Sequence, residues 1–314
     1  MSAEEKKISI LGLDNAGKSS IALYLDRKFS LISKLRPTKL ANINTQSVDI
    51  LGLHLSIWDL GGQKQYRSEY LKNKEMYFSN LSGFFYVIDI QDEKRYEISI
   101  SYLSNLAKLI REYNPDLEDL VILLHKYDPE IQGSEKYLNK IKSLEDKIES
   151  LSLDFTITFY PTSIYDGSNL MKAFSFSVIR KTGKAKLLEN ILKEYTKETW
   201  SSAAILLNES YLFLASRATE EQYLNFCTDI VPDLSKVMDR LNRWDIKTED
   251  SIMNVLIKNG KAKKRKKGII FMKRIDIENY GCVYLMTLCL NKKVRDRAYE
   301  YIPQLAEKIK TIID

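Results

Sequence analysis

The sequence predicts two domains of different fold class, an α/β domain followed by an α+β domain. Residues 6–180 alternate short apolar runs with longer amphipathic ones, which is typical of strands connected by crossover helices. Beyond the basic segment 181–184 the expected order becomes helix, two strands, helix, three strands and helix, which favours an antiparallel sheet covered by helices. A chain of 314 residues is long enough for two ordinary domains. We expect them at 1–182 and 183–314.

The first domain is expected to contain a six-stranded, mostly parallel sheet. The continuous apolar runs at 84–88 and 120–124 are typical of central strands that helices cover on both faces. The alternation of apolar and polar residues across 48–57 instead indicates an antiparallel hairpin at one edge. The expected strands span residues 7–12, 46–51, 53–59, 83–90, 120–126 and 154–160.

The second domain is expected to contain a five-stranded antiparallel sheet and three helices. Its strands are predicted from short apolar runs separated by turn residues such as Asn208 and Glu209. One long helical pattern contains Pro232, which should kink or divide that helix. The expected strands span residues 203–207, 211–216, 251–258, 268–275 and 281–290, and the expected helices span 185–197, 219–244 and 293–312.

Composition and charge exclude several classes of protein. With 44% hydrophobic and 29% charged residues, and only 12 Gly and 6 Pro, the chain is neither a linker nor a fibre. Residues 1–180 carry 23 basic and 24 acidic side chains, whereas residues 181–314 carry 25 and 18, so the net positive charge lies in the second domain. The 3 cysteines and 2 histidines have spacings unlike those of zinc ligands, which argues against a disulfide framework and a structural zinc site.

No signal for membrane insertion or secretion is visible in the sequence. No apolar stretch approaches the roughly 18 residues that a membrane-spanning helix needs. Residues 1–5 lack the basic-then-apolar order of a signal peptide. We therefore expect a cytoplasmic protein that contacts an internal membrane or the plasma membrane peripherally, through a partner or a surface patch.

The first strand leads into a phosphate-binding loop. Residues 12–19 match the pattern G-x-x-x-x-G-K-[ST], and a helical pattern begins at the end of the loop. Glycines let backbone N–H groups approach phosphate oxygens, Lys18 can reach the outer phosphates, and the Ser19 hydroxyl can ligate Mg²⁺. A chance glycine-rich turn is the alternative. The expected nucleotide contacts in this loop are Gly12, Asp14, Asn15, Ala16, Gly17, Lys18, Ser19 and Ser20.

A second group of polar residues follows the third strand. Asp59 can hold magnesium through water, the Gly62 N–H can meet a γ-phosphate, and Gln63 can orient an attacking water. Upstream, Thr38 can complete the magnesium shell. The alternatives are a strand-end turn residue for Asp59 and a plain loop threonine for Thr38. The expected metal ligands are Ser19, Thr38 and Asp59, and the expected catalytic residues are Lys18, Thr38 and Gln63.

The end of the fifth strand is expected to bind the nucleotide base through His125, Lys126 and Asp128. The Asp128 carboxylate can accept hydrogen bonds from N1 and N2 of guanine, but the N1 acceptor of adenine would repel it. The Lys126 stem can cover the base plane. Ser163 and Ile164, which follow the sixth strand, would close the pocket. A polar strand end is the alternative for the first three, but motifs that end several parallel strands meet at the sheet edge where α/β proteins bind ligands.

Taken together, these motifs resemble those of Ras-superfamily small GTPases. The segments similar to Arf proteins are 11–20, 37–38 and 58–63. The segments similar to Rag/Gtr GTPases are 86–92, 125–128, where His replaces the usual Asn, and 160–166. The order of elements after residue 182 is similar to the roadblock domain that Rag proteins carry behind their GTPase domain.

The resemblance implies a P-loop GTPase domain followed by a roadblock/longin-like domain. It implies GTP or GDP and Mg²⁺ as ligands. It also implies a homo- or heterodimer formed through the second domain, together with protein regulators and effectors. The expected function is a nucleotide-controlled switch in signalling or trafficking.

The residues leave the extent of hydrolysis open. Gln63 makes turnover chemically possible, but GTPases of this architecture are slow until a partner supplies an arginine, an effect of about a thousandfold or more. Arg36 is either a weaker substitute within the chain or a solvated loop residue. A nucleotide-bound scaffold with little turnover is the alternative function. An ATP-using protein would require Asp128 to point away from the base.

A basic cluster is formed by the seven positive side chains within Lys258–Lys267, which contains no acidic residue. Its glycine and the strands expected on either side place it in a hairpin loop. Such a cluster can attract anionic lipid at about 1 kcal/mol per residue near a surface, and a solvated loop is the alternative. Nucleic acid is the less suitable ligand, because no aromatic residue is interleaved with the charges to stack on bases.

Overall fold

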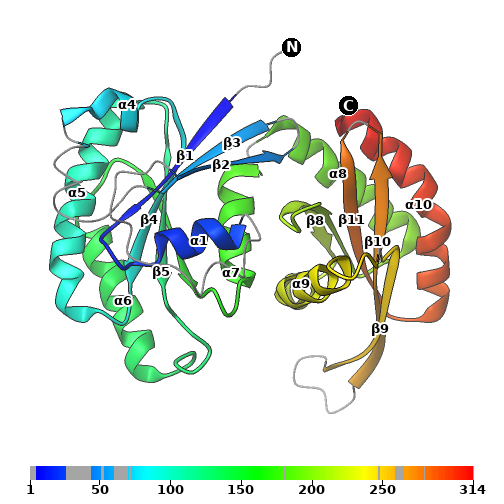
Figure 1. Cartoon of the computed structure of the whole chain (residues 1–314). Coiled ribbons are helices and arrows are strands. Elements are labelled where there is room, and N and C mark those ends of the chain that lie inside the picture. Colours follow the sequence, from blue (N-terminus) through cyan, green and yellow to red (C-terminus); the bar gives the residue numbers. More distant parts are fainter. Residues whose placement is uncertain are drawn as a thin grey trace. The chain divides into compact units, whose positions relative to one another are not determined.

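A computed structural model describes residues 5–25, 44–50, 53–59, 70, 72–179, 182–246, 248–258, 265–278 and 280–313. The chain divides into two compact units, Met1–Ala173 and Phe174–Asp314. Each unit is built around one β-sheet (Figure 1).

The first unit contains a sheet with the strand order β2-β3-β1-β4-β5-β6. The strands β1, β4, β5 and β6 pair in parallel, each with the next in this order. On the other side of β1, β3 pairs with it in parallel, and β2 pairs antiparallel with β3. The predicted parallel sheet with an antiparallel hairpin at one edge is therefore confirmed. Its strands are β1 (Glu5–Gly12), β2 (Asn44–Ile50), β3 (Leu53–Asp59), β4 (Leu81–Asp89), β5 (Asp119–His125) and β6 (Thr156–Thr162).

Helices cover both faces of this sheet. In Figure 1, α5 and α6 lie on one side of the sheet, and α1 and α7 lie on the other. Buried residues of α5 recur every three or four positions, which is the spacing of a helix with one apolar face. The described helices are α1 (Lys18–Leu25), α4 (Lys74–Phe78), α5 (Tyr96–Tyr113), α6 (Glu135–Glu149), α7 (Ser168–Phe174) and the short 3-10 helix Glu93–Arg95.

The core between the sheet and the helices α5 and α6 contains large aromatic side chains. Phe84 and Tyr86 of β4 belong to this core, together with Leu103 of α5 and Leu144 of α6. Burial of each such side chain contributes about 1.5–3 kcal/mol. The Tyr86 hydroxyl donates to the Ser99 carbonyl oxygen at 2.8 Å, so its polar end is also satisfied. This packing fixes the ends of β4 and β5, from which several site residues extend.

The strand order places a ligand-binding edge beside β1. After β1, the next two strands along the chain, β2 and β3, lie on one side of β1. The strands that follow, β4, β5 and β6, lie on its other side, so β1 is the point where the strand order reverses. In open α/β sheets, the crevice at the carboxyl ends of the strands next to such a point is where ligands bind. β1 ends at Gly12 and β5 ends at His125, so both predicted motifs begin at this edge.

The second unit contains a five-stranded antiparallel sheet in the order β8-β7-β11-β10-β9, as predicted. Helices α8 and α10 pack against each other, with the rings of Tyr195 and Tyr301 5.8 Å apart and Lys308 Nζ 2.5 Å from Glu194 Oε1. Its strands are β7 (Ala203–Asn208), β8 (Phe213–Ala218), β9 (Asp250–Lys258), β10 (Arg265–Ile277) and β11 (Gly281–Cys289). Its helices are α8 (Gly183–Thr199), α9 (Glu221–Asn242), α10 (Lys292–Ile313) and the π-helix Ser175–Ile179.

The second unit begins earlier than the boundary expected after residue 182. The π-helix packs on β8, where the Phe213 N–H donates to Ser175 Oγ at 2.9 Å and the ring of Phe176 stacks on that of Phe213 at 6.3 Å. These contacts tie residues 174–179 to a strand that lies far along the chain.

Two further features concern the helices. The sequence predicts that Pro232 kinks or divides its helix. In the structure α9 continues through Pro232 as one helix, so it is not divided there. Within the part of the chain that the structure describes, no helix combines the length and apolar character needed to cross a membrane.

Candidate functional site

The loop after β1 has a backbone that requires glycine at two positions. Gly12 has a φ of +146°, and a Cβ there would lie 2.4 Å from the carbonyl oxygen of Val87. Gly17 has a φ of +97°, and a Cβ there would lie 2.4 Å from Cδ2 of His125. L-residues rarely adopt such φ values, and neither position has room for a side chain. The loop therefore lies directly on the ends of β4 and β5, with its backbone available for close approach to phosphate.

Helix α1 begins where the loop ends. The Ile21 N–H donates to the carbonyl oxygen of Gly17 at 3.0 Å. The first turn of an α-helix is a suitable place for an anion, because its N–H groups point toward the ligand and the helix dipole is positive there. The Lys18 side chain is buried and its Nζ donates to the Leu13 carbonyl oxygen at 2.8 Å, so it folds across the loop. Ser19 follows in the first turn of α1. The predicted strand, loop and helix are thus in the order that a phosphate site needs.

The carboxylate predicted to bind the base is held at the same sheet edge. Asp128 Oδ1 accepts a hydrogen bond from Ser163 Oγ at 2.6 Å, and Asp128 Oδ2 accepts one from Gln91 Nε2 at 3.2 Å. Ser163 Oγ in turn accepts from the Tyr165 N–H at 3.1 Å. Ser163 therefore fixes the orientation of Asp128. Ile164 follows in the same turn and is half-buried.

Lys126 connects this motif to the end of β4. Its Nζ lies 2.7 Å from Asp89 Oδ2, and its carbonyl oxygen accepts from Gln91 Nε2 at 2.8 Å. Lys126 has a φ of 63°, in the left-handed region that non-glycine residues seldom adopt. Such backbone strain is common at functional sites. The strained turn lets the Tyr127 N–H donate to the Thr162 carbonyl oxygen at 3.0 Å, which joins the ends of β5 and β6.

His125 lies beneath the site, between the two motifs. It is 2% exposed, its Nδ1 lies 3.0 Å from Thr162 Oγ1, and its ring lies against Gly17. Burial, and to a smaller extent the positive charge of Lys126, lower the pKa of His125 to about 3. The imidazole is therefore neutral at physiological pH. It joins the base motif to the phosphate loop by packing.

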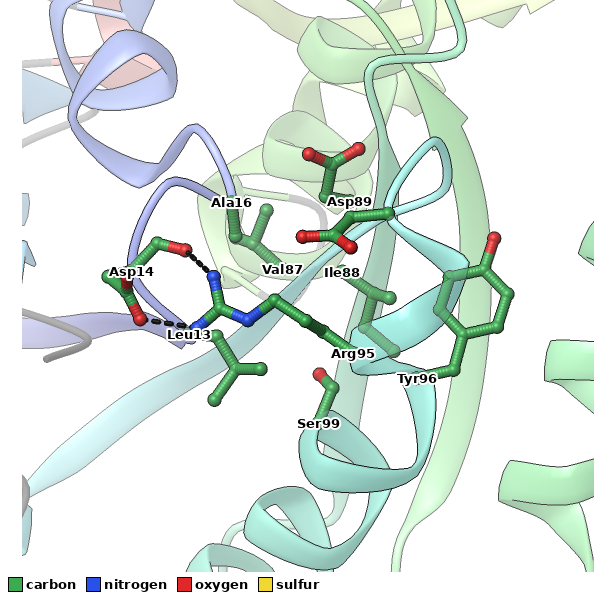
Figure 2. A pocket seen from close by; sticks show the side chains of 10 residues that line it. Leu13, Asp14, Ala16, Val87, Ile88, Asp89, Arg95, Tyr96 and Ser99 are labelled. Carbon is green, nitrogen blue, oxygen red and sulfur yellow. Dashed lines mark hydrogen bonds and ion pairs between the residues drawn. The ribbon is translucent and has the colours of Figure 1, made fainter. Parts of the chain in front are cut away.

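Arg95 binds the phosphate loop from the segment after β4. Its NH1 donates to the Asp14 carbonyl oxygen at 3.0 Å, and its NH2 pairs with Asp14 Oδ1 (Figure 2). Burial raises the pKa of Asp14, but the hydrogen bond and the charge of Arg95 outweigh burial and hold the pKa below its usual value. Beside the pair lies a cavity of about 20 Å³, lined by Asp89 and Tyr96 among others. It has room for about one water molecule.

Three residues of the site were assigned no role from the sequence, namely Asp89, Gln91 and Arg95. They lie in one segment that begins at the last residue of β4, and they bind Lys126, Asp128 and Asp14. The available signals were the position of this segment at the carboxyl end of a central strand and the resemblance of residues 86–92 to Rag/Gtr GTPases. This segment, Asp89–Arg95, is called the β4–α5 segment below.

The structure does not place every predicted site residue. Thr38, Gly62 and Gln63 lie outside the described residues. The backbone of Asp59 ends β3 and is paired in register with Ile10 of β1, so β3 ends beside the phosphate loop. Hydroxyl and carboxylate oxygens are suitable ligands for Mg²⁺, and the glycine-lined loop with its buried lysine fits the phosphates that would accompany the ion.

Comparisons with known proteins point to small GTPases. The family model of the Gtr1/RagA G protein conserved region matches residues 7–234. Ras-related GTP-binding protein A of Dictyostelium discoideum is 26% identical over 221 residues, which are 69% of this chain and 71% of that protein. ADP-ribosylation factor-like protein 3 of Chlamydomonas reinhardtii is 39% identical over 124 residues, 40% of this chain and 64% of that protein.

A solved structure of the Arl6 BBS3 small GTPase from Trypanosoma brucei, with the bound nucleotide analogue GppNp, superposes with a TM-score of 0.41 at 20% identity. The matched region covers 55% of this chain and 95% of the Trypanosoma brucei chain. The family assignment rests on the family model, which spans most of the chain, including the phosphate loop, the base motif and the β4–α5 segment. The chain belongs to the Gtr1/RagA family of small GTPases, whose members bind guanine nucleotides and hydrolyse GTP.

Proposed function

We propose that this chain is a magnesium-dependent switch that binds GTP, hydrolyses it slowly and presents different surfaces in its GTP and GDP states. The observation that carries the proposal is the position of Asp128, which Ser163 holds at 2.6 Å at the same sheet edge as the phosphate loop. A carboxylate there accepts hydrogen bonds from guanine and repels adenine. The neighbouring loop supplies backbone N–H groups for the phosphates.

Five residues of the predicted site supply the chemistry in this proposal. Lys18 compensates negative charge on the outer phosphates, and Gln63 orients a water molecule for attack on the γ-phosphorus. As the bond from the water oxygen to the γ-phosphorus forms, the bond from that phosphorus to the oxygen that bridges to the β-phosphate breaks. GDP keeps the electron pair of the broken bond, and the proton of the water leaves with the inorganic phosphate. Ser19, Thr38 and Asp59 would hold Mg²⁺, which neutralises charge on the phosphate oxygens when bound.

Hydrolysis separates this proposal from its alternative, a nucleotide-bound scaffold with little turnover. The test is single-turnover phosphate release from GTP, with and without Mg²⁺, for the full chain and for Gln63→Leu. Loss of hydrolysis in the variant with retained GTP binding supports a switch. If both proteins bind GTP but release equal and negligible amounts of phosphate, the result supports the alternative, a nucleotide-bound scaffold.

We further propose that residues 183–314 form a roadblock-like domain through which the chain forms a homo- or heterodimer. The antiparallel order β8-β7-β11-β10-β9, with helices α8, α9 and α10, supports this proposal. Light scattering on the isolated full chain tests it. A dimer mass supports a homodimer. A monomer mass leaves the heterodimer, which co-expression with a homologous partner chain and measurement of the mass of the copurified complex would test.

Peripheral membrane contact is a separate proposal. Lys258 ends β9 and Arg265 begins β10, so the two ends of the basic cluster belong to neighbouring antiparallel strands. Binding of the full chain to vesicles that contain anionic lipid, and loss of that binding after the lysines are replaced by glutamine, would support the contact. Equal binding to neutral vesicles would exclude an electrostatic mechanism.

A further inference from the structure

The ion pair between Arg95 and Asp14 joins two parts of the site that are 81 residues apart in the sequence. Figure 2 shows the guanidinium of Arg95 extended along the loop, with one contact to the Asp14 carboxylate and one to its carbonyl oxygen. The guanidinium therefore compensates a charge and also fixes the peptide group at that position. A lysine provides the charge but not this two-pronged geometry.

The position of Asp14 makes its charge important for the ligand. Asp14 is the third residue of a loop whose N–H groups face the phosphates. An unpaired carboxylate at this position would repel a phosphate chain that carries several negative charges. At an effective dielectric constant of about 20, two unit charges about 8–10 Å apart interact strongly enough to change an affinity by roughly tenfold or more.

We propose that Arg95 is a positioning residue that neutralises the Asp14 carboxylate and thereby favours GTP, which has the additional phosphate, over GDP. This inference rests on the proposed function, since it concerns the same nucleotide site. It assigns a role to the β4–α5 segment that neither the phosphate loop nor the base motif supplies.

The other charged groups near the pair leave Arg95 as its main counter-charge. Asp89 and Asp92 line the same cavity and are themselves acidic, and Asp89 is paired with Lys126 at 2.7 Å. Lys18 contributes a favourable charge to Asp14, but a smaller one than Arg95. Removal of Arg95 would therefore leave net negative charge beside the phosphate loop.

If the Arg95–Asp14 pair only stabilised the fold, its loss would affect unfolding and not specifically nucleotide affinity. The side chains of Arg95 and Asp14 are 30% and 41% exposed, and ion pairs as exposed as this contribute little to the stability of a fold. Loss of the pair should therefore change nucleotide affinity much more than unfolding. The two quantities can be measured on the same protein samples.

The experiment compares dissociation constants for Mg–GTP and Mg–GDP in five full-length proteins. They are the wild type, Arg95→Gln, Arg95→Lys, the double variant Arg95→Gln/Asp14→Asn, and Lys94→Gln. Lys94 is exposed and adjacent to Arg95, so it controls for the loss of one positive charge from the same turn. Thermal unfolding of each protein verifies that it is folded.

We expect Arg95→Gln to weaken GTP binding by about tenfold and GDP binding by a smaller factor. Arg95→Lys should keep the GTP-to-GDP preference nearer to that of the wild type, because it keeps the charge. The double variant should bind GTP more tightly than Arg95→Gln, because it no longer carries an unpaired carboxylate. The effect of Arg95→Gln should also decrease at high salt.

Two outcomes would overturn the inference. If Arg95→Gln is folded and its affinities match those of Lys94→Gln, the pair has no role in nucleotide preference. If the double variant binds GTP no more tightly than Arg95→Gln, repulsion by the Asp14 carboxylate is not the cause of the lost GTP affinity. A wild-type protein that binds neither nucleotide would instead overturn the proposed function, and this inference with it.

Discussion

Gly17 and His125 are packed so closely that a methyl group on Gly17 would lie 2.4 Å from Cδ2 of the imidazole. The two residues belong to different motifs, one to the phosphate loop and one to the base motif. His125 also lies 3.0 Å from Thr162 Oγ1, at the end of a third strand. The contact therefore makes the phosphate loop, the base motif and the turn after β6 parts of one rigid site.

A first prediction concerns Gly17→Ala. The φ of +97° and the contact with His125 together should destabilise the protein by about 3 kcal/mol or more and abolish nucleotide binding. Gly133→Ala is the matched control, because Gly133 also has a positive φ, +74°, but no atom lies within 4 Å of the added Cβ. It should cost about 1 kcal/mol. Urea unfolding measures both, and equal costs would show that the Gly17–His125 contact is unimportant.

A second prediction concerns the pH dependence of stability. The pKa of His125 is about 3 in the folded protein, against about 6.5 in the unfolded chain, so only the unfolded chain binds this proton between these values. The free energy of unfolding should therefore decrease as the pH falls from 7.5 to 5.0. The part due to His125 is about 2 kcal/mol. At pH 7.5 the histidine is neutral in both states and contributes no pH dependence.

His125→Asn isolates this contribution. The other titrating groups remain in the variant, so the loss of stability between pH 7.5 and 5.0 should be about 2 kcal/mol smaller than in the wild type. Urea unfolding at the two pH values measures the difference. An identical pH dependence in the two proteins would mean that His125 is not buried in its neutral form.

A third prediction tests the recognition of the base. In Asp128→Asn, one acceptor for guanine is replaced by an NH₂ group that faces the guanine N2 donor, so GTP affinity should fall by about a hundredfold. Xanthine has an oxygen in place of N2 and matches the new donor. The variant should therefore bind xanthosine triphosphate more tightly than GTP. Competition binding with the two nucleotides measures this, and an unchanged preference for GTP would remove Asp128 from the base site.

A fourth prediction concerns the orientation of that carboxylate. Ser163→Ala removes the 2.6 Å hydrogen bond to Asp128 but leaves the carboxylate in place. GTP affinity should fall by roughly threefold to tenfold, less than in Asp128→Asn, because one hydrogen bond to a charged group is lost. Ser134→Ala, outside the site, is the control. A loss as large as that of Asp128→Asn would indicate that Ser163 itself contacts the nucleotide.

The local parts of this structure could be predicted from the sequence. The strand, loop and helix around Gly12, Gly17 and Lys18 follow from a contiguous motif. The close contacts of Gly12 with Val87 and of Gly17 with His125 join distant parts of the chain, and the motif alone does not predict them. The antiparallel sheet of the second unit also follows from local apolar periodicity and turn residues. Strand and helix ends differ from expectation by only a few residues.

The parts that could not be predicted depend on distant contacts. Arg95 and Asp14 are 81 positions apart, and nothing in a basic residue within a helical turn indicates a partner in the phosphate loop. The π-helix Ser175–Ile179 belongs to the second unit because of its contacts with Phe213, which periodicity does not reveal. Pro232 is likewise accommodated by α9, whose buried face packs against the sheet.

The central claim is that this site selects guanine through Asp128 while the phosphate loop holds the phosphates. The most direct test is calorimetric titration of the nucleotide-free full chain with GTP, and separately with ATP, in the presence of Mg²⁺. The account predicts one GTP per chain and an affinity for ATP at least about a hundredfold lower. Equal affinity for the two nucleotides would contradict it.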